Sequence, residues 1–79
     1  MRVMILEDDP WIADLLKQVV LSLRPAAQVK CLGSVAEALL DWQQHAADLV
    51  ISDWNLPDDQ GTHLLERVRR DNPQVPLLM

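Results

Sequence analysis

Carboxylate side chains follow two short apolar segments of this sequence. Residues 3–6 are Val-Met-Ile-Leu and precede Glu7 and Asp8, while residues 49–52 are Leu-Val-Ile-Ser and precede Asp53. Runs of consecutive apolar residues are typical of strands that are buried on both faces. In open α/β sheets, ligands bind in the crevice beyond the carboxyl ends of the strands. Carboxylates gathered there are suited to holding a hard cation such as Mg²⁺.

Asp9 and Pro10 open a predicted helix. Asp is a favoured N-cap, and Pro is tolerated at the first helical position because its missing N–H is not needed there. The helix ends before Pro25, since the residue before a proline avoids helical backbone angles. Six apolar residues recur at helical spacing and predict one inward-facing stripe, made of Ile12, Leu15, Leu16, Val19, Val20 and Leu23.

A second strand over residues 29–32 and a second helix come next. Ser34 and Glu37 form a predicted capping box, in which the Ser34 hydroxyl accepts from a backbone N–H and Glu37 bonds back toward the cap. The helix runs to about Gln44 or His45. Its expected inner face is Ala36, Leu39 and Leu40.

Turn-forming residues at 55–61 predict a loop, and a third helix is expected over residues 62–71. Its expected inward residues are Leu64, Leu65 and Val68. A fourth strand begins at Val75. The order βαβαβαβ predicts an α/β fold with a parallel sheet and right-handed crossovers.

The composition limits what this chain can be. Its 79 residues are enough for one domain, and an apolar fraction of 49% is typical of a globular protein. A net charge of −5 argues against nucleic-acid binding by this segment. No stretch is long and apolar enough for a membrane span, and Cys31 has no partner for a disulfide. We expect a cytoplasmic module without a membrane segment.

Two motifs resemble those of the receiver domain of bacterial two-component response regulators. They are residues 4–9 (Met-Ile-Leu-Glu-Asp-Asp) and residues 49–57 (Leu-Val-Ile-Ser-Asp-Trp-Asn-Leu-Pro), followed by Gly61. The resemblance spans the whole chain as given. It implies a flavodoxin-like (CheY-like), doubly wound parallel sheet with strand order 2-1-3-4-5, in which the first and third strands are neighbours.

The same resemblance assigns a site. Asp53 matches the phosphoacceptor, which receives a phosphoryl group from a histidine kinase or a phosphotransfer protein. Glu7, Asp8 and Asp53, together with the backbone carbonyl of Asn55, match the residues that hold Mg²⁺. Mg²⁺ takes octahedral oxygen ligands, and phosphoryl transfer depends on positioning and charge neutralisation. The implied function is a signalling module that regulates a downstream output, not an enzyme with an external substrate.

The resemblance also implies that residues 1–79 are the N-terminal part of an incomplete domain. Helix 4, strand 5 and helix 5 of a receiver are then absent. The hydroxyl residue that follows strand 4 and the lysine that follows strand 5 are absent as well. A fourth strand without a neighbour is an open edge that templates pairing with another chain. We therefore expect self-association through this edge, mainly by Leu77, Leu78 and Met79.

Two other functions compete with this one. A degenerate receiver would keep the fold as an interaction surface that works without phosphorylation. A phosphatase of the haloacid dehalogenase type would use Asp-x-Asp, but here Asn55 stands at the second position and cannot act as a general acid.

Other reactive side chains are expected to be structural. His45 and His63 have no Cys or His partner at metal-binding spacing. Arg67, Arg69 and Arg70 lie near a helix C-terminus, where cations complement the helix dipole. Cys31 is expected to be a small buried strand residue.

Overall fold

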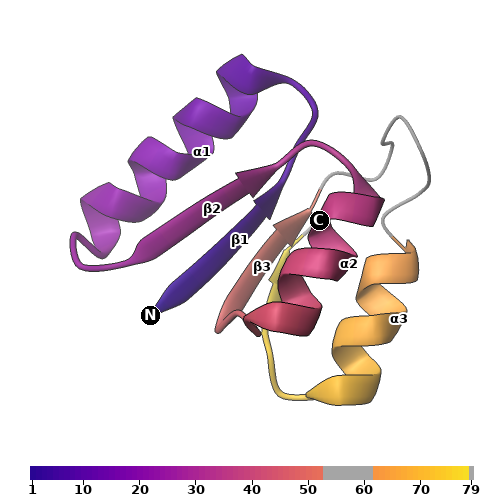
Figure 1. Ribbon diagram of the computed structural model, residues 1–79. Coiled ribbons are helices and arrows are strands. Elements are labelled where there is room, and N and C mark those ends of the chain that lie inside the picture. The colour runs from indigo at the N-terminus through magenta and orange to yellow at the C-terminus, as the bar shows by residue number, and fades with distance from the viewer. Residues whose placement is uncertain (53–61, 79) are drawn as a thin grey trace.

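The computed structural model describes residues 1–52 and 62–78, which form alternating strands and helices (Figure 1). The elements are β1 (Arg2–Leu6), α1 (Pro10–Leu23), β2 (Gln28–Leu32), α2 (Val35–Gln44), β3 (Leu49–Ser52), α3 (Thr62–Asp71) and β4 (Leu77–Leu78). The predicted order βαβαβαβ is confirmed. Among these helices, none is both long enough and apolar enough to cross a membrane.

The four strands form one parallel sheet in the order β2-β1-β3-β4. β1 lies at its centre, where Leu6 pairs with Leu32 on one side and with Ser52 on the other. Leu77 and Leu78 pair β4 with β3. Figure 1 shows α1 on one face of this sheet and α2 and α3 on the other. This is the doubly wound arrangement that the sequence predicted.

The alternation of strand side chains creates two cores of unequal size. Met4, Leu6 and Val50 face α2 and α3 and belong to the larger core. The helices contribute Val35, Ala38, Trp42, Leu64 and Val68 to that core. The smaller core lies under α1 and contains Val3, Ile5 and Val20. Strands that feed both cores explain why the segment 3–6 is apolar at every position.

Both predicted helix starts are confirmed. Asp9 Oδ1 accepts from the Trp11 N–H at 2.9 Å, and the Ser34 hydroxyl accepts from the Glu37 N–H at 3.2 Å. Glu37 Oε2 in turn accepts from the Gly33 N–H at 3.3 Å. These bonds satisfy N–H groups that have no partner within a helix.

The predicted inner face of α2 is largely wrong. Ala36 and Leu40 are exposed, whereas Val35, Ala38 and Trp42 are buried. Trp42 is buried in the larger core instead, and its Nε1 donates to Asp71 Oδ2 of α3 at 2.8 Å. A buried indole with a hydrogen-bond partner decides how the helix is rotated.

The predicted inner stripe of α1 is also only partly buried. Val20 is buried and Leu16 is half-buried, but Ile12, Leu15, Val19 and Leu23 are exposed. Within the described residues, α1 packs mainly against β1 and β2, and Leu49 and Ile51 of β3 join the small core beneath it. One edge of its apolar stripe therefore has no described element against it.

Asp71 joins the two helices on the other face of the sheet. Its Oδ2 accepts from Trp42 Nε1 at 2.8 Å and from Arg67 Nε at 2.7 Å. These two hydrogen bonds, chiefly the one from Arg67, hold the pKa of the Asp71 carboxyl below its usual range. A carboxylate at this point stabilises the α2–α3 packing through its ionised form.

The substitution Asp71→Asn is expected to lower the free energy of unfolding at pH 7 and to lower it less at acidic pH. A carboxyl whose pKa is depressed by folding stabilises the fold fully above its unfolded value of about 3.9, and this contribution is lost as the pH falls through the folded value. Urea midpoints of wild type and variant should therefore differ at pH 7 and converge toward pH 3. The exposed Asp14→Asn serves as the control. A difference that is the same at both pH values would contradict this role of Asp71.

Candidate functional site

The end of β1 brings two acids to the carboxyl edge of the sheet. The Glu7 N–H donates to the Leu32 carbonyl at 3.0 Å, so β1 continues its pairing with β2 for one more residue. Asp8 follows and is exposed. On the other side of β1, Leu6 pairs with Ser52, the residue that precedes Asp53 in the sequence. The pairing is parallel, so both strands end at this same edge.

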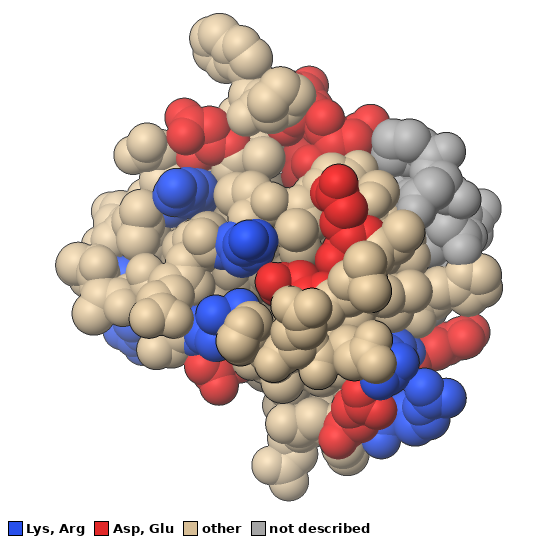
Figure 2. All heavy atoms as spheres, in the orientation of Figure 1, with Lys and Arg blue, Asp and Glu red and all other residues tan. Residues whose placement is uncertain are grey.

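The three consecutive acids have different environments. Glu7 Oε1 accepts from the Asp9 N–H at 3.1 Å, and Asp9 Oδ1 is occupied as the N-cap of α1. Asp8 forms no hydrogen bond or ion pair with any described residue. Figure 2 shows acidic side chains gathered at the top of the view, over the connection from β1 to α1. Asp8 is thus the carboxylate of this turn that is available to a cation.

The described residues contain only part of the predicted site. Asp53 and Asn55 lie outside them, so the structure brings together Glu7 and Asp8 but does not test the two other positions. Within residues 1–52 and 62–78, no group of three or more potential metal-binding side chains occurs. Glu7 and Asp8 offer oxygen atoms, which are the ligands that Mg²⁺ takes. The residues that are present fit this cation.

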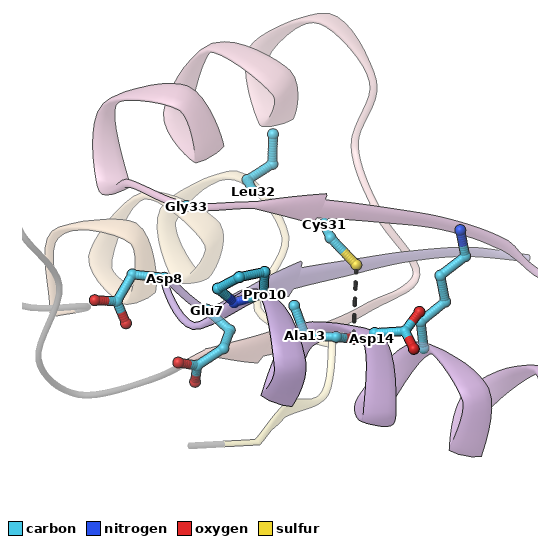
Figure 3. A pocket seen from close by; sticks show the side chains of 9 residues that line it. Glu7, Asp8, Pro10, Ala13, Asp14, Cys31, Leu32 and Gly33 are labelled. Atoms are coloured by element: carbon cyan, nitrogen blue, oxygen red, sulfur yellow. Dashed lines mark hydrogen bonds between the residues drawn. The ribbon is translucent and has the colours of Figure 1, made fainter.

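A hollow of about 460 Å³ adjoins Glu7 and Asp8 between α1 and the end of β2 (Figure 3). Figure 3 shows the two acids at one end of the hollow and Asp14 at the other, with Cys31 between them. Cys31 is exposed, so the prediction that it is buried is wrong. Its Sγ lies 3.9 Å from the Ala13 carbonyl oxygen, and partial burial raises the pKa of the thiol. A thiol with a raised pKa is a poor metal ligand at neutral pH.

Sequence reasoning did not foresee how Glu7 is used. Its side chain folds back onto the Asp9 N–H, so it supports the turn that carries Asp8. The only sequence signal for this hydrogen bond is an acidic residue two positions before an N-cap, and this signal is weak. Asp71 was likewise not singled out, because its partner Trp42 lies 29 positions away.

The fold and the edge of acids define the class of protein. Four parallel strands in the order β2-β1-β3-β4, with one helix on one face and two on the other, form a CheY-like α/β fold. The family model for the response regulator receiver domain matches residues 3–79. The chain belongs to this family.

Individual relatives agree with this assignment. The chain is 26% identical over 81 aligned residues to the methanol utilization control regulatory protein MoxX of Paracoccus denitrificans. The alignment covers 100% of this chain and 36% of MoxX. The chemotaxis response regulator CheY4 of Vibrio cholerae superposes with a TM-score of 0.86 at 25% identity, covering 99% of this chain and 65% of CheY4. The non-phosphorylated HemR receiver domain of Leptospira biflexa superposes with a TM-score of 0.81 at 28% identity, and the match covers 96% of this chain and 60% of the HemR chain. The chain therefore spans about a third of MoxX and somewhat under two thirds of these receiver structures.

Proposed function

We propose that this chain is a phosphoacceptor module, in which Asp53 receives a phosphoryl group from a histidine kinase or a phosphotransfer protein. Glu7, Asp8, Asp53 and the carbonyl of Asn55 would hold Mg²⁺. The observation that carries the proposal is the pairing of Leu6 with Ser52, since the acids of β1 and Asp53 directly follow these two partners. The module would act in the cytoplasm and regulate a downstream output rather than convert an external substrate.

The chemistry explains why acids are needed on neighbouring strands. A carboxylate oxygen of Asp53 would attack phosphorus, forming an O–P bond as the P–N bond to the donor histidine breaks. A bound Mg²⁺ would supply the positive charge that reduces the repulsion between the two anions. Asp8 is exposed and would bind this ion, while Glu7 would help to hold it and also supports the turn by accepting from the Asp9 N–H. Nucleic-acid binding is not part of the proposal, because the chain has a net charge of −5.

The alternative is a degenerate receiver, which binds partners without being phosphorylated. Both functions are compatible with the fold, so an experiment must show whether Asp53 accepts a phosphoryl group. Membership of the receiver family sets aside the haloacid dehalogenase phosphatase.

Beryllofluoride, an analogue of the phosphoryl group, tests the proposal. With Mg²⁺ present, it should change the fluorescence of Trp54, which adjoins Asp53 in the sequence. Asp53→Asn should abolish this change. The control is Asp48→Asn, at the residue before β3, where an amide oxygen can still accept the 2.8 Å hydrogen bond from the Arg2 N–H. No response in the wild type, or an equal response in Asp53→Asn, would favour the degenerate receiver.

A further inference from the structure

The sheet has an open edge at β2. In the strand order β2-β1-β3-β4, β2 has a neighbouring strand on one side only. The receiver order 2-1-3-4-5 places strand 5 beside β4, so β2 is an edge strand in a complete receiver as well. We call the free side of Gln28–Leu32 the β2 edge. The self-association expected at β4 concerns the opposite edge of the sheet and stays a prediction.

The β2 edge presents backbone groups in the pattern that an added strand needs. The Gln28 N–H donates to the Met1 carbonyl at 2.8 Å, and the Leu32 carbonyl accepts from the residue after β1 at 3.0 Å. Alternate residues of a parallel strand turn their N–H and C=O groups to the same side, so residues 28, 30 and 32 face β1. The backbone groups of Val29 and Cys31 therefore point outward, where no described strand pairs with them.

A hollow flanks β2 on each face of the sheet. The hollow of about 460 Å³ between α1 and the end of β2 (Figure 3) includes Cys31 and Leu32 in its lining, and we call it the α1 hollow. The second hollow, of about 270 Å³, is lined by Lys30 of β2 and His45 at the end of α2, among others, and we call it the α2 hollow. Strand addition takes its affinity from main-chain hydrogen bonds and its specificity from pockets for alternate side chains. The β2 edge has both features.

The α1 hollow suits an apolar side chain of an added strand. Its lining already contains the carboxylates of Glu7, Asp8 and Asp14 against one base, Lys17. A further acid placed there would meet like charges, which is unfavourable.

The α2 hollow suits an acidic side chain instead. Lys30 is exposed and forms no hydrogen bond or ion pair with any described residue. Arg2 also lines this hollow, but its guanidinium lies 3.7 Å from Asp41 Oδ2, so its charge is partly balanced. Figure 2 shows basic side chains over β2, apart from the acids at the top of the view. Lys30 is thus the cation of this face that is available to a partner.

We propose that the β2 edge binds an extended segment of another protein in which acidic and apolar residues alternate. The segment adds one strand beside β2 and forms hydrogen bonds with the outward N–H and C=O groups of Val29 and Cys31. Its acids lie beside Lys30, because side chains on the same face of neighbouring strands contact each other. Its apolar side chains lie on the other face, toward the α1 hollow.

A second copy of this chain fits the β2 edge less well. Lys30 is the middle residue of β2. Two antiparallel β2 strands paired about their middle would place Lys30 opposite Lys30 of the partner subunit. Like charges directly opposite each other destabilise a sheet, so a segment that carries acids is the better occupant.

Fluorescence anisotropy with a synthetic peptide tests the proposal. The probe is a labelled heptapeptide with blocked ends, Thr-Glu-Val-Glu-Val-Glu-Thr. The control peptide has the same composition without the alternation, Thr-Val-Glu-Glu-Glu-Val-Thr. We expect the alternating peptide to bind at least about tenfold more tightly than the control peptide.

Two pairs of variants separate charge from backbone pairing. Lys30→Glu should weaken binding of the alternating peptide at least about tenfold, whereas Arg70→Glu makes the same change of charge on an exposed side chain of α3 and should leave binding unchanged. Cys31→Pro removes an outward N–H and should also weaken binding at least about tenfold, whereas Cys31→Ala keeps this N–H and should not. Circular dichroism shows whether each variant is folded. If Cys31→Pro does not fold, the control peptide and Lys30→Glu still decide the test.

Three outcomes would overturn the proposal. The first is no binding of the alternating peptide at about 1 mM, which would leave Lys30 as a charge that keeps the edge unpaired. The second is equal binding of the two peptides, or equal binding by the wild type and a folded Cys31→Pro, since charge attraction without strand pairing would explain either result. The third is a wild-type dimer in sedimentation equilibrium that Cys31→Pro dissociates, which would assign the β2 edge to a second copy.

Discussion

Asp8→Asn is expected to abolish most of the Mg²⁺ binding of this chain. Asp8 is exposed at the carboxyl edge of the sheet and forms no hydrogen bond or ion pair with the other described residues. The substitution removes a carboxylate charge with almost no change of shape. The loss of affinity should reach or exceed the ~10–100-fold that removing an outer-sphere partner typically costs.

The neighbouring acids provide graded controls for this experiment. Glu7→Gln keeps an oxygen that can accept from the Asp9 N–H, so its effect should be smaller than that of Asp8→Asn. Asp9→Asn should have little effect, because Asn caps a helix about as well as Asp does. Calorimetric titration with Mg²⁺ gives the three affinities. An affinity in Asp8→Asn equal to that of the wild type, or a loss in Asp9→Asn as large as that in Asp8→Asn, would contradict the assignment of Asp8.

Leu64→Ala is expected to remove much of the stability of the domain. Leu64 is fully buried on α3 and packs in the larger core. A buried Leu→Ala substitution costs about 2–5 kcal/mol, depending on how far the cavity collapses. A chain of this length has a free energy of unfolding of roughly 4–12 kcal/mol. The substitution should therefore remove a substantial part of this free energy of unfolding.

Leu40→Ala is the matched control, since it makes the same chemical change at an exposed leucine of α2. Surface substitutions usually stay within about 0.5 kcal/mol. Urea denaturation followed by circular dichroism should show a much lower midpoint for Leu64→Ala. The midpoint of Leu40→Ala should stay almost equal to that of the wild type. Similar midpoints for the two variants would show that the described packing of α3 is wrong.

The fold was predictable because its signals are local and strong. The apolar runs at 3–6 and 49–51 are too short for helices and too continuous for half-exposed strands. Asp9 with Pro10, and Ser34 with Glu37, indicate helix starts within one turn. The strand order came from the family resemblance and not from these patterns.

The faces of the helices were less predictable, because they depend on distant partners. In α2, the apolar spacing favoured Leu39 and Leu40 as inward residues. Trp42 is buried instead, and it donates a hydrogen bond to Asp71 of α3, which is distant in the sequence. In α1 the apolar arc is wider than the surface that β1 and β2 can cover. Periodicity shows that a residue is apolar and in phase, but not whether another element is there to cover it.

The places of Glu7 and Asp8 after β1 were predictable, but the hydrogen bonds that these acids form were not. The spacing of Glu7, Asp8 and Asp53 relative to two strands indicated their common edge. Which acid supports the turn and which remains available depends on backbone N–H directions, and these follow from the course of the turn. Asp53 and Asn55 remain predictions, since the described residues do not include them.

Phosphorylation at Asp53 tests the central claim most directly. The chain should be incubated with Mg²⁺ and a small phosphodonor, and intact-mass spectrometry should then be used to count the phosphoryl groups bound. The account predicts one Mg²⁺-dependent phosphoryl group in the wild type and in Asp48→Asn, and none in Asp53→Asn. Absence of any phosphoryl group in the wild type, or its persistence in Asp53→Asn, would contradict it.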